Sequence, residues 1–404
     1  MHINSTKPSI NVLGKFLWVP LTSDEADQFL SSRSSVGATK SLTMGNLSLI
    51  QIKTSSFSQL RDYMHMEKDC DEFGIFDSFV EAKHFISKLE IENHSKFDAP
   101  DIDNYKVAKV LRKHIHTRRM SDFLNLLVGS FKNRYLYSKN GMEAADLIYK
   151  EWSLISSLRK DIEVIKYKHP GFEQNSVILT IPGTVDDKEI VILGAHLDSI
   201  RRAESDIYCA NKPSRRKIKA PGADDNASGV TVLTEAISTL IDTDYRPQKT
   251  IQFMAYALEE CELNPLDPIY SKGGSRQIAA KYKKEGKNVI GMINFDMVGY
   301  HNKTNEICLE SGESTNKDQD HFLKELMEHH MNDMSFKVVP KDCFCSDHVS
   351  WTLNGFPASY LVECERSPHY HSETDIVENV DILLVRKYAQ VAVVYIAEAA
   401  KGTT

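Results

Sequence analysis

The feature that most constrains the fold is a series of short runs rich in Val, Ile and Leu, separated by segments with a helical pattern. The clearest of these runs lie at 176–181, 189–195, 250–257 and 289–295. Short runs that are apolar almost throughout are typical of strands buried on both faces of a sheet. Strands that alternate with helices predict an α/β fold with a mostly parallel central sheet and helices on both of its faces.

The length of the chain predicts two folded units. At 404 residues it exceeds the roughly 250–300 residues at which a single hydrophobic core stops growing. Residues 1–90 have a strand, helix, strand, helix pattern, which we interpret as a small α+β module. Residues 91–104 are polar and aperiodic with one Pro, which is typical of a linker. Residues 105–404 then form the α/β domain, opening with amphipathic helices at 105–127 and 141–159.

Composition excludes several classes of protein. The formal net charge of −7 gives no basic surface for nucleic acid, and no apolar run approaches the roughly 20 residues that cross a bilayer. We therefore expect neither nucleic-acid binding nor membrane insertion. The first residues lack the pattern of a signal peptide, and seven cysteines neither require nor exclude an oxidising compartment.

Imidazole and carboxylate side chains follow the predicted strands. His196 and Asp198 come directly after the run at 189–195. Residues two apart in an extended chain point the same way, so His196 can bind a metal while Asp198 accepts its other N–H and fixes the tautomer. Asp225 lies in a glycine-containing turn before a helix, where acidic residues also serve as N-caps. We interpret Asp224 and Asn226 as caps and prefer a metal for Asp225.

Two adjacent carboxylates, Glu259 and Glu260, follow the run at 250–257. They would repel one another unless a cation compensates one of them. We therefore predict Glu260 as a metal ligand and Glu259 as the general base for an attacking water. Asp296 likewise follows the run at 289–295.

A late polar segment offers one more imidazole, from either His369 or His371. Two histidines and three carboxylates are too many ligands for one tetrahedral catalytic zinc, which takes three protein ligands and water. They suit two ions about 3.5–4 Å apart that share a carboxylate. Nitrogen and oxygen ligands without thiolate favour Zn²⁺, with Mn²⁺ or Co²⁺ as possible substitutes.

At these residues the sequence resembles the bacterial secreted leucyl aminopeptidases, in the co-catalytic zinc exopeptidase family that also contains glutamate carboxypeptidase II and glutaminyl cyclase. The resemblance runs from about Ser121 to the end of the chain. The segments that carry it are 131–135, 194–199, 222–229, 254–260, 285–289, 295–297, 345–348 and 371–375.

The resemblance assigns a role to each residue of the predicted site. It implies that Asp225 bridges two Zn²⁺ ions, that His196 and Asp296 complete one site, and that Glu260 and His371, rather than His369, complete the other. It also implies that Glu259 is the general base and Asp198 a supporting carboxylate. The implied reaction is hydrolysis of the N-terminal residue from peptides with free N-termini.

Substrate preference, localisation and regulation also follow from the resemblance alone. Residues that align with the walls of a hydrophobic pocket, and so imply a preference for Leu or another hydrophobic residue, are Met297, Tyr360, Val362 and Tyr370. The relatives are secreted, which implies an extracellular protein. The module at 1–90 resembles, more weakly, their inhibitory propeptides, which implies intramolecular inhibition.

The sequence departs from the family pattern in three places. The loop at 261–270 is longer than usual, so the rim of the pocket is expected to differ. Cys343 and Cys345 are separated by one residue where the relatives pair cysteines three residues apart, which leaves that disulfide open. The segment from Glu363 to His371 is shortened.

Three other functions fit part of this pattern. A glutaminyl cyclase-like acyltransferase would use a single zinc, whereas motifs for two sites are present. A two-zinc carboxypeptidase or deacylase with a lid domain needs more than the 371 − 296 = 75 residues between Asp296 and His371. A non-catalytic binding module would be expected to lose ligands or the base, and none is missing from this sequence.

Overall fold

The computed structural model describes residues 16–33, 36–68, 75–76, 78–92, 95–201, 215–260, 273–300, 305–340 and 344–404. The described residues form two compact units. The smaller unit takes in the residues up to 91 together with Phe344 and Cys345, and the larger unit holds the rest.

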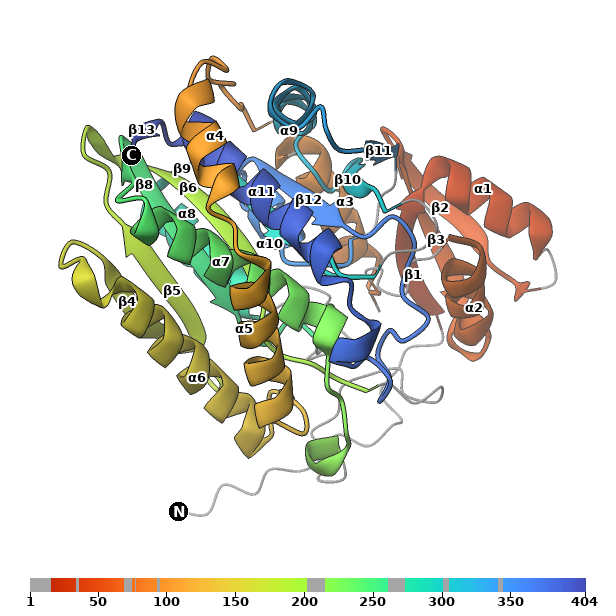
Figure 1. The fold of residues 1–404 in the computed structure, drawn as a ribbon. Helices are drawn as coiled ribbons and strands as arrows, with labels where there is room; N and C mark the ends of the chain where they lie inside the picture. Colours follow the sequence, from red (N-terminus) through yellow and green to blue (C-terminus); the bar gives the residue numbers. More distant parts are fainter. Residues whose placement is uncertain are drawn as a thin grey trace, which may run out of the picture. The chain divides into compact units, whose positions relative to one another are not determined.

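The smaller unit is a three-stranded antiparallel sheet with three helices (Figure 1). Its strands are β1 (Phe16–Thr22), β2 (Thr39–Met44) and β3 (Leu47–Lys53), in the order β1-β3-β2, and its helices are α1 (Ser23–Ser32), α2 (Phe57–Lys68) and α3 (Phe79–Glu92). α1 begins at a capping box, in which the Thr22 hydroxyl accepts from the Glu25 N–H and the Glu25 carboxylate accepts from the Thr22 N–H.

The pattern that we expected for this unit lacks β2 and α3. β2 is largely exposed, so it carries no apolar alternation. α3 does carry a helical signal, because Ala82, Phe85, Ile86 and Leu89 recur at helical spacing and are buried.

The larger unit is built on an eight-stranded sheet in the order β11-β10-β12-β9-β6-β8-β5-β4. Its strands are β4 (Glu163–Tyr167), β5 (Ser176–Ile181), β6 (Asp186–His196), β8 (Lys249–Tyr256), β9 (Asn288–Phe295), β10 (Ile307–Ser311), β11 (Phe336–Pro340) and β12 (Ala358–Val362). The pairs β6–β8, β6–β9, β9–β12 and β10–β11 are parallel, whereas β4–β5, β5–β8 and β10–β12 are antiparallel. A two-residue ribbon, β7 (Arg246–Pro247) with β13 (Gly402–Thr403), lies outside this sheet.

Helices cover both faces of the large sheet, as the sequence predicted (Figure 1). They are α4 (Tyr105–Lys113), α5 (Thr117–Ser130), α6 (Lys139–Ile155), α7 (Gly229–Asp242), α8 (Gly273–Lys284), α9 (Lys317–His330), α10 (His348–Thr352) and α11 (Ile382–Ala399). In β6, Val191 and Leu193 pack in a hydrophobic cluster with residues of α7 and α11. The alternate residues Ile190 and Ile192 pack in a second cluster with residues of α8 and α10. Successive side chains of one strand therefore enter two cores on opposite faces.

The single helix predicted at 105–127 is wrong, because α4 and α5 are separate helices. The backbone between them bonds to α7 instead of continuing the helix. The His114 carbonyl accepts from the Thr239 hydroxyl at 3.2 Å, and the His116 N–H donates to Glu235 Oε1 at 2.6 Å. These contacts fix the turn at the point where the two helices meet.

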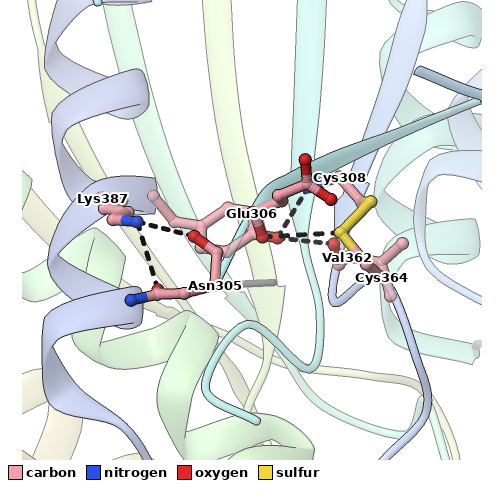
Figure 2. The surroundings of a disulfide bond; sticks show 7 residues. Asn305, Glu306, Cys308, Val362, Cys364 and Lys387 are labelled. Carbon is pink, nitrogen blue, oxygen red and sulfur yellow. Dashed lines mark hydrogen bonds between the residues drawn. A yellow bond between two sulfur atoms is a disulfide. The ribbon is translucent and has the colours of Figure 1, made fainter. Parts of the chain in front are cut away.

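A disulfide that the sequence analysis did not predict joins Cys308 in β10 to Cys364, two residues after β12 (Figure 2). Beside it, Lys387 Nζ donates to the backbone and side-chain oxygens of Asn305 at 2.6 and 3.1 Å. The pairing of Cys343 with Cys345 that was left open involves Cys343, which lies outside the described residues. None of the helices in the described part of the chain is long and apolar enough to cross a membrane.

Candidate metal centre

Two residues of the predicted metal site are placed by neighbouring parallel strands. His196 is the last residue of β6, and Asp296 directly follows β9. His196 Nε2 lies 3.1 Å from Asp296 Oδ1. The parallel register of β6 and β9 brings both side chains to the carboxyl end of the sheet, where functional groups of open α/β sheets collect.

The other three predicted ligands come from loops. Asp225 lies in the irregular turn Ala223–Ser228 before α7, Glu260 follows β8, and His371 lies beyond β12. His371 Nε2 lies 3.1 Å from Asp225 Oδ2 and 2.8 Å from Glu260 Oε2. Asp225 Oδ1 lies 3.2 Å from His196 Nε2, so the Asp225 carboxylate stands between the two imidazoles. All five side chains are buried.

His369, the other histidine considered for the site, does not join this group. Its Nδ1 lies 2.9 Å from Thr374 Oγ1 in an exposed environment. By contrast, ligand atoms of His196, Asp225 and Glu260 lie within 4.8 Å of one another, and His371 contacts two of these three residues.

The turn that carries Asp225 is held at both ends. Asp375 accepts the backbone N–H groups of Asp224 and Asp225 at 2.8 and 3.1 Å. Asn226 donates to the Phe295 carbonyl at 2.8 Å and accepts from the Gly229 N–H, so its side chain acts as a cap for the first N–H of α7, although Ser228 holds the N-cap position. Asp224 does not act as that cap. Its carboxylate accepts the Gly299 N–H at 2.7 Å, because the turn folds back over the end of β9.

Gly222, which precedes this turn, has a left-handed backbone with φ of 58°. A Cβ at this position would collide with the Asp225 carbonyl, so only glycine fits.

Asp198 supports the site in a way that the sequence did not predict. Its side chain was expected to accept from His196, but His196 Nδ1 lies 3.7 Å from Asp198 Oδ1, too far for a hydrogen bond. The Asp198 backbone carbonyl lies 3.2 Å from His196 Nδ1 instead. The carboxylate accepts the N–H groups of Glu259 and Glu260, both at 3.2 Å. One residue therefore orients the imidazole and also holds the backbone of the two glutamates.

Two further residues, Ser346 and Arg134, support the site and were not predicted as functional residues from the sequence. The Ser346 hydroxyl donates to Asp296 Oδ2 at 2.6 Å. Arg134 is 1% exposed, and its guanidinium donates to the carbonyls of Leu197, Pro221 and Gly222. Arg134 thus ties the segment after His196 to the turn before Asp225. The only sequence signals were their places in the segments 131–135 and 345–348 that carry the resemblance.

The electrostatics of the group suit a cation. Burial raises the pKa of the Glu260 carboxyl to about 7, and the negative charge of Asp225 adds to the rise. Burial acts in the same direction on Asp225, but hydrogen bonds from His196 and His371 outweigh it and lower the pKa of that carboxyl. Glu260 Oε1 is buried and accepts no hydrogen bond within the described structure. Buried carboxylates that crowd together in this way are stabilised by a metal ion, and imidazole and carboxylate donors fit zinc.

Glu259, the predicted general base, is 4% exposed and follows Leu258, which has a left-handed backbone with φ of 65°. Its charge helps to raise the pKa of His196 well above the usual value, against the effect of burial and in addition to the effect of Asp296. Glu259 is therefore one of the buried charges that act electrostatically on His196.

Of the four predicted pocket residues, Tyr370 contacts a ligand of the group, and the other three lie on β12 or next to Asp296 in the chain. Tyr370 stacks on His371, with ring centroids 3.6 Å apart. Tyr360 and Val362 are alternate residues of β12, and Met297 directly follows Asp296. The long loop at 261–270, expected to reshape the rim, lies outside the described residues.

Known proteins share both the sequence pattern and the fold. Residues 176–396 match peptidase family M28. A probable leucine aminopeptidase of Arthroderma benhamiae is 35% identical over 289 residues, which cover 69% of this chain and 69% of the relative. The crystal structure of LapB from Legionella pneumophila has a TM-score of 0.70 at 20% identity and covers 96% of this chain and 100% of that chain.

The LapA aminopeptidase of Legionella pneumophila has a TM-score of 0.69 at 18% identity and covers 95% of this chain and 98% of that chain. The two structural matches show that the fold is shared, whereas the family match and the 35% identity show the family to which the chain belongs. This chain therefore belongs to peptidase family M28, and it is a zinc-dependent aminopeptidase.

Proposed function

We propose that this enzyme removes single N-terminal residues from peptides with a pair of zinc ions that share Asp225. His196 and Asp296 complete one site, and Glu260 and His371 complete the other. The observation that carries the proposal is the placement of the two Asp225 oxygens. Oδ1 lies 3.2 Å from His196 Nε2 and Oδ2 lies 3.1 Å from His371 Nε2, as a carboxylate shared by two ions requires.

The residues around the pair divide the chemistry. Zinc ions bound here would polarise the scissile carbonyl and make water a better nucleophile at neutral pH. Glu259 takes a proton from the attacking water as its oxygen bonds to the carbonyl carbon. When the C–N bond breaks, Glu259 returns that proton to the leaving amine. Asp198 keeps Glu259 in place through its hydrogen bond to the Glu259 N–H.

The charge of the site supports action at chain ends. The carboxylates of Asp225, Glu260 and Asp296 are buried and contact the imidazoles of His196 and His371. The free α-amino group of a peptide carries a positive charge that these carboxylates attract, whereas an internal peptide bond offers none. This difference favours removal of one residue at a time.

A preference for Leu or another hydrophobic residue is proposed from the printed names of the relatives and from Met297, Tyr360, Val362 and Tyr370 as pocket walls. Tyr360 and Met297 are almost fully buried, and the Tyr360 ring stacks on His348 with ring centroids 4.4 Å apart. Chromogenic anilides of single amino acids measure this preference. Faster cleavage of a Lys or Glu derivative than of the Leu derivative would contradict it.

We also propose that residues 1–90 form a propeptide-like module that restrains the domain at 105–404, with residues 91–104 as the connection. Phe344 belongs to the smaller unit, where the Phe85 ring lies 5.8 Å from its ring. Two residues later in the chain, the Ser346 hydroxyl donates to Asp296. The proposal rests on this contact within the smaller unit and on the short stretch of chain from Phe344 to Ser346.

Proteolysis within 91–104 tests this restraint. A rise in kcat/KM after cleavage is expected, and Phe85→Ala should give a smaller rise because it weakens only the ring contact. Activity that is unchanged by cleavage would contradict the restraint, whatever its effect on stability.

A secreted location is proposed from the Cys308–Cys364 disulfide, since disulfides persist mainly in oxidising compartments. Fractionation of the producing cells tests this. Protein confined to a reducing compartment, with both thiols reactive toward an alkylating reagent, would contradict it.

One experiment tests the central proposal and separates it from the single-zinc cyclase. Zinc per chain is measured together with hydrolysis of a leucine anilide before chelation, after chelation and after zinc is restored. We expect two zinc ions, loss of activity on chelation and recovery on return of zinc. One zinc per chain with cyclisation of N-terminal glutamine and no anilide hydrolysis would establish the cyclase instead.

A further inference from the structure

A second recessed site lies on the helical layer of the larger unit, among residues that take no part in the metal centre. The groove has a volume of about 530 Å³, within the range of small-molecule sites. It is bordered by α4, the end of α9 and α11, which contact one another (Figure 1). Its lining residues are Tyr105, Lys109, Arg112, Lys113, His329, His330, Asn332, Asp333, Arg386 and Gln390.

The groove is strongly basic in a chain whose net charge is −7. Four of its lining side chains are Lys or Arg, and Asp333 is its only acidic one. Asp333 is already engaged, because Arg112 Nη2 donates to both of its oxygens at 2.8 and 3.0 Å. Lys109, Lys113 and Arg386 make no ion pair within the described part of the chain. The charge of Arg386 also acts on Asp333 and helps to lower the pKa of that carboxyl. One carboxylate therefore faces four cations, which leaves an excess of three positive charges in the lining.

A buried and unsatisfied side chain marks the floor of the groove. Gln390 is 4% exposed, and its Nε2 donates to the Arg112 carbonyl at 3.3 Å. Because a carbonyl only accepts, this bond fixes the orientation of the amide. Its Oε1 is left without a hydrogen-bond partner in the described structure. A buried acceptor without a partner costs free energy, so a ligand that brings a donor such as a hydroxyl group would be favoured here.

The wall of the groove is rigid on one side. His330 Nε2 lies 2.8 Å from Glu398 Oε1, and the His330 ring packs against Tyr105 at a centroid distance of 4.9 Å. Arg112 also donates to the His330 carbonyl. These contacts hold Arg112, His330 and Tyr105 in place before any ligand arrives, so this wall loses little conformational freedom on binding.

From these observations we infer that the groove is a second binding site, for an organic phosphate that carries at least two negative charges and a free hydroxyl group. A phosphate group carries about −1.5 to −2 charges at pH 7, so a diphosphate ester balances the three cations where a single carboxylate cannot. Lys109, Lys113 and Arg386 donate to the phosphate oxygens, and Gln390 Oε1 accepts from the hydroxyl group.

Calorimetric titration of the full chain with ADP and with pyrophosphate, at low salt, tests the inference. ADP is expected to bind with one molecule per chain, and more tightly than pyrophosphate because only ADP brings a ribose hydroxyl to Gln390. The double variant Lys109→Glu with Arg386→Glu should bind ADP about 100-fold more weakly, since it loses two charge-assisted contacts worth roughly tenfold each. Lys160→Glu with Lys287→Glu, two exposed lysines outside the groove, changes the net charge equally and should bind as the wild type does.

Several outcomes would overturn the inference. Equal loss of affinity in both double variants would make the effect one of net charge. Undiminished binding of ADP by the groove variant would place the phosphate at the metal centre. An affinity for ADP no higher than that for pyrophosphate would contradict the proposed contact between the hydroxyl group and Gln390. Binding to phosphatidylglycerol vesicles without binding of ADP would make the groove a membrane-facing surface. Leucine-anilide hydrolysis by the groove variant serves as a check that it is folded.

Discussion

The two halves of the predicted metal centre are built in different ways. The strand-end pair, His196 and Asp296, sits where two parallel strands of the sheet end. The loop pair, Glu260 and His371, lies outside the strands, and His371 itself has φ of 50°. Leu258, two residues before Glu260, has φ of 65°, and Met297, directly after Asp296, has φ of 53°. Non-glycine residues adopt such conformations only when the surrounding structure holds them.

This difference indicates that the two pairs depend on different interactions. The positions of the strand-end pair follow from the register of the large sheet, which its apolar cores stabilise. The loop pair depends on a few hydrogen bonds, such as those from the backbone of Glu259 and Glu260 to Asp198. We therefore expect changes in those hydrogen bonds to affect the loop pair first.

The largest effect is expected from Asp225→Asn, because Asp225 is the one residue shared by both halves. Each metal ion supplies several kcal/mol of transition-state stabilisation, so loss of both is expected to lower kcat/KM by about 10⁴-fold or more. Zinc per chain, measured by mass spectrometry after dialysis, should fall from two to below one. Asp187→Asn, at an exposed position of β6, is the matched control. Retention of two zinc ions would show that Asp225 is not shared.

Next in size is Glu259→Gln, which separates the chemistry from metal binding. Glu259 is adjacent to a residue of the loop pair, yet the proposed mechanism has it bind no metal. Loss of a general base typically lowers turnover by about 10²- to 10⁴-fold. Zinc content should stay at two per chain, since all five ligands remain. Turnover close to that of the wild type would contradict the assignment of Glu259 as the general base.

The same comparison explains how much of the site could be predicted from the sequence. The strand before His196 and the strand before Asp296 are apolar runs whose ends can be located from the pattern alone. His371 could not be chosen over His369 in this way, because both lie in one polar segment. What distinguishes His371 is its contact with Asp225 and Glu260, which lie far away in the sequence. The resemblance made that choice, and the geometry agrees with it.

Features that depend on long-range contacts were missed for a similar reason. Arg134 precedes the Pro221 carbonyl that it contacts by 87 residues, and the Cys308–Cys364 disulfide spans 56. Neither has a local pattern that would reveal its partner. The break between α4 and α5 was missed because Glu235 of α7 supplies the hydrogen bond that fixes it.

An intermediate effect is expected from Asp198→Asn. The Asp198 backbone carbonyl contacts His196 of the strand-end pair, and its carboxylate accepts from the backbone of Glu259 and Glu260. The change replaces one carboxylate oxygen by an NH₂ group, which cannot accept from the Glu259 or Glu260 N–H. Loss of a group that orients metal ligands typically costs about 10- to 100-fold in metal affinity or activity. Competition with a zinc chelator should show one ion bound more weakly and the other nearly unchanged. Equal weakening of both ions would mean that Asp198 supports the halves alike.

The smallest effect on activity is expected from Cys308→Ser with Cys364→Ser. Cys364 lies 371 − 364 = 7 residues before His371, so the disulfide anchors the segment that leads into the loop pair. A disulfide with a sequence separation of 56 is worth about 4 kcal/mol of unfolding free energy by the chain-entropy estimate, and denaturant titration should show a loss of that order. Folded protein should keep kcat/KM within a few-fold, because none of the five ligands changes.

Under chelation the zinc of the loop pair should leave earlier than in the wild type, while the zinc of the strand-end pair should leave at the same rate. The wild type held in reductant provides the matched comparison, and an unfolding midpoint that neither treatment moves would show that the bond contributes nothing to the free energy of unfolding.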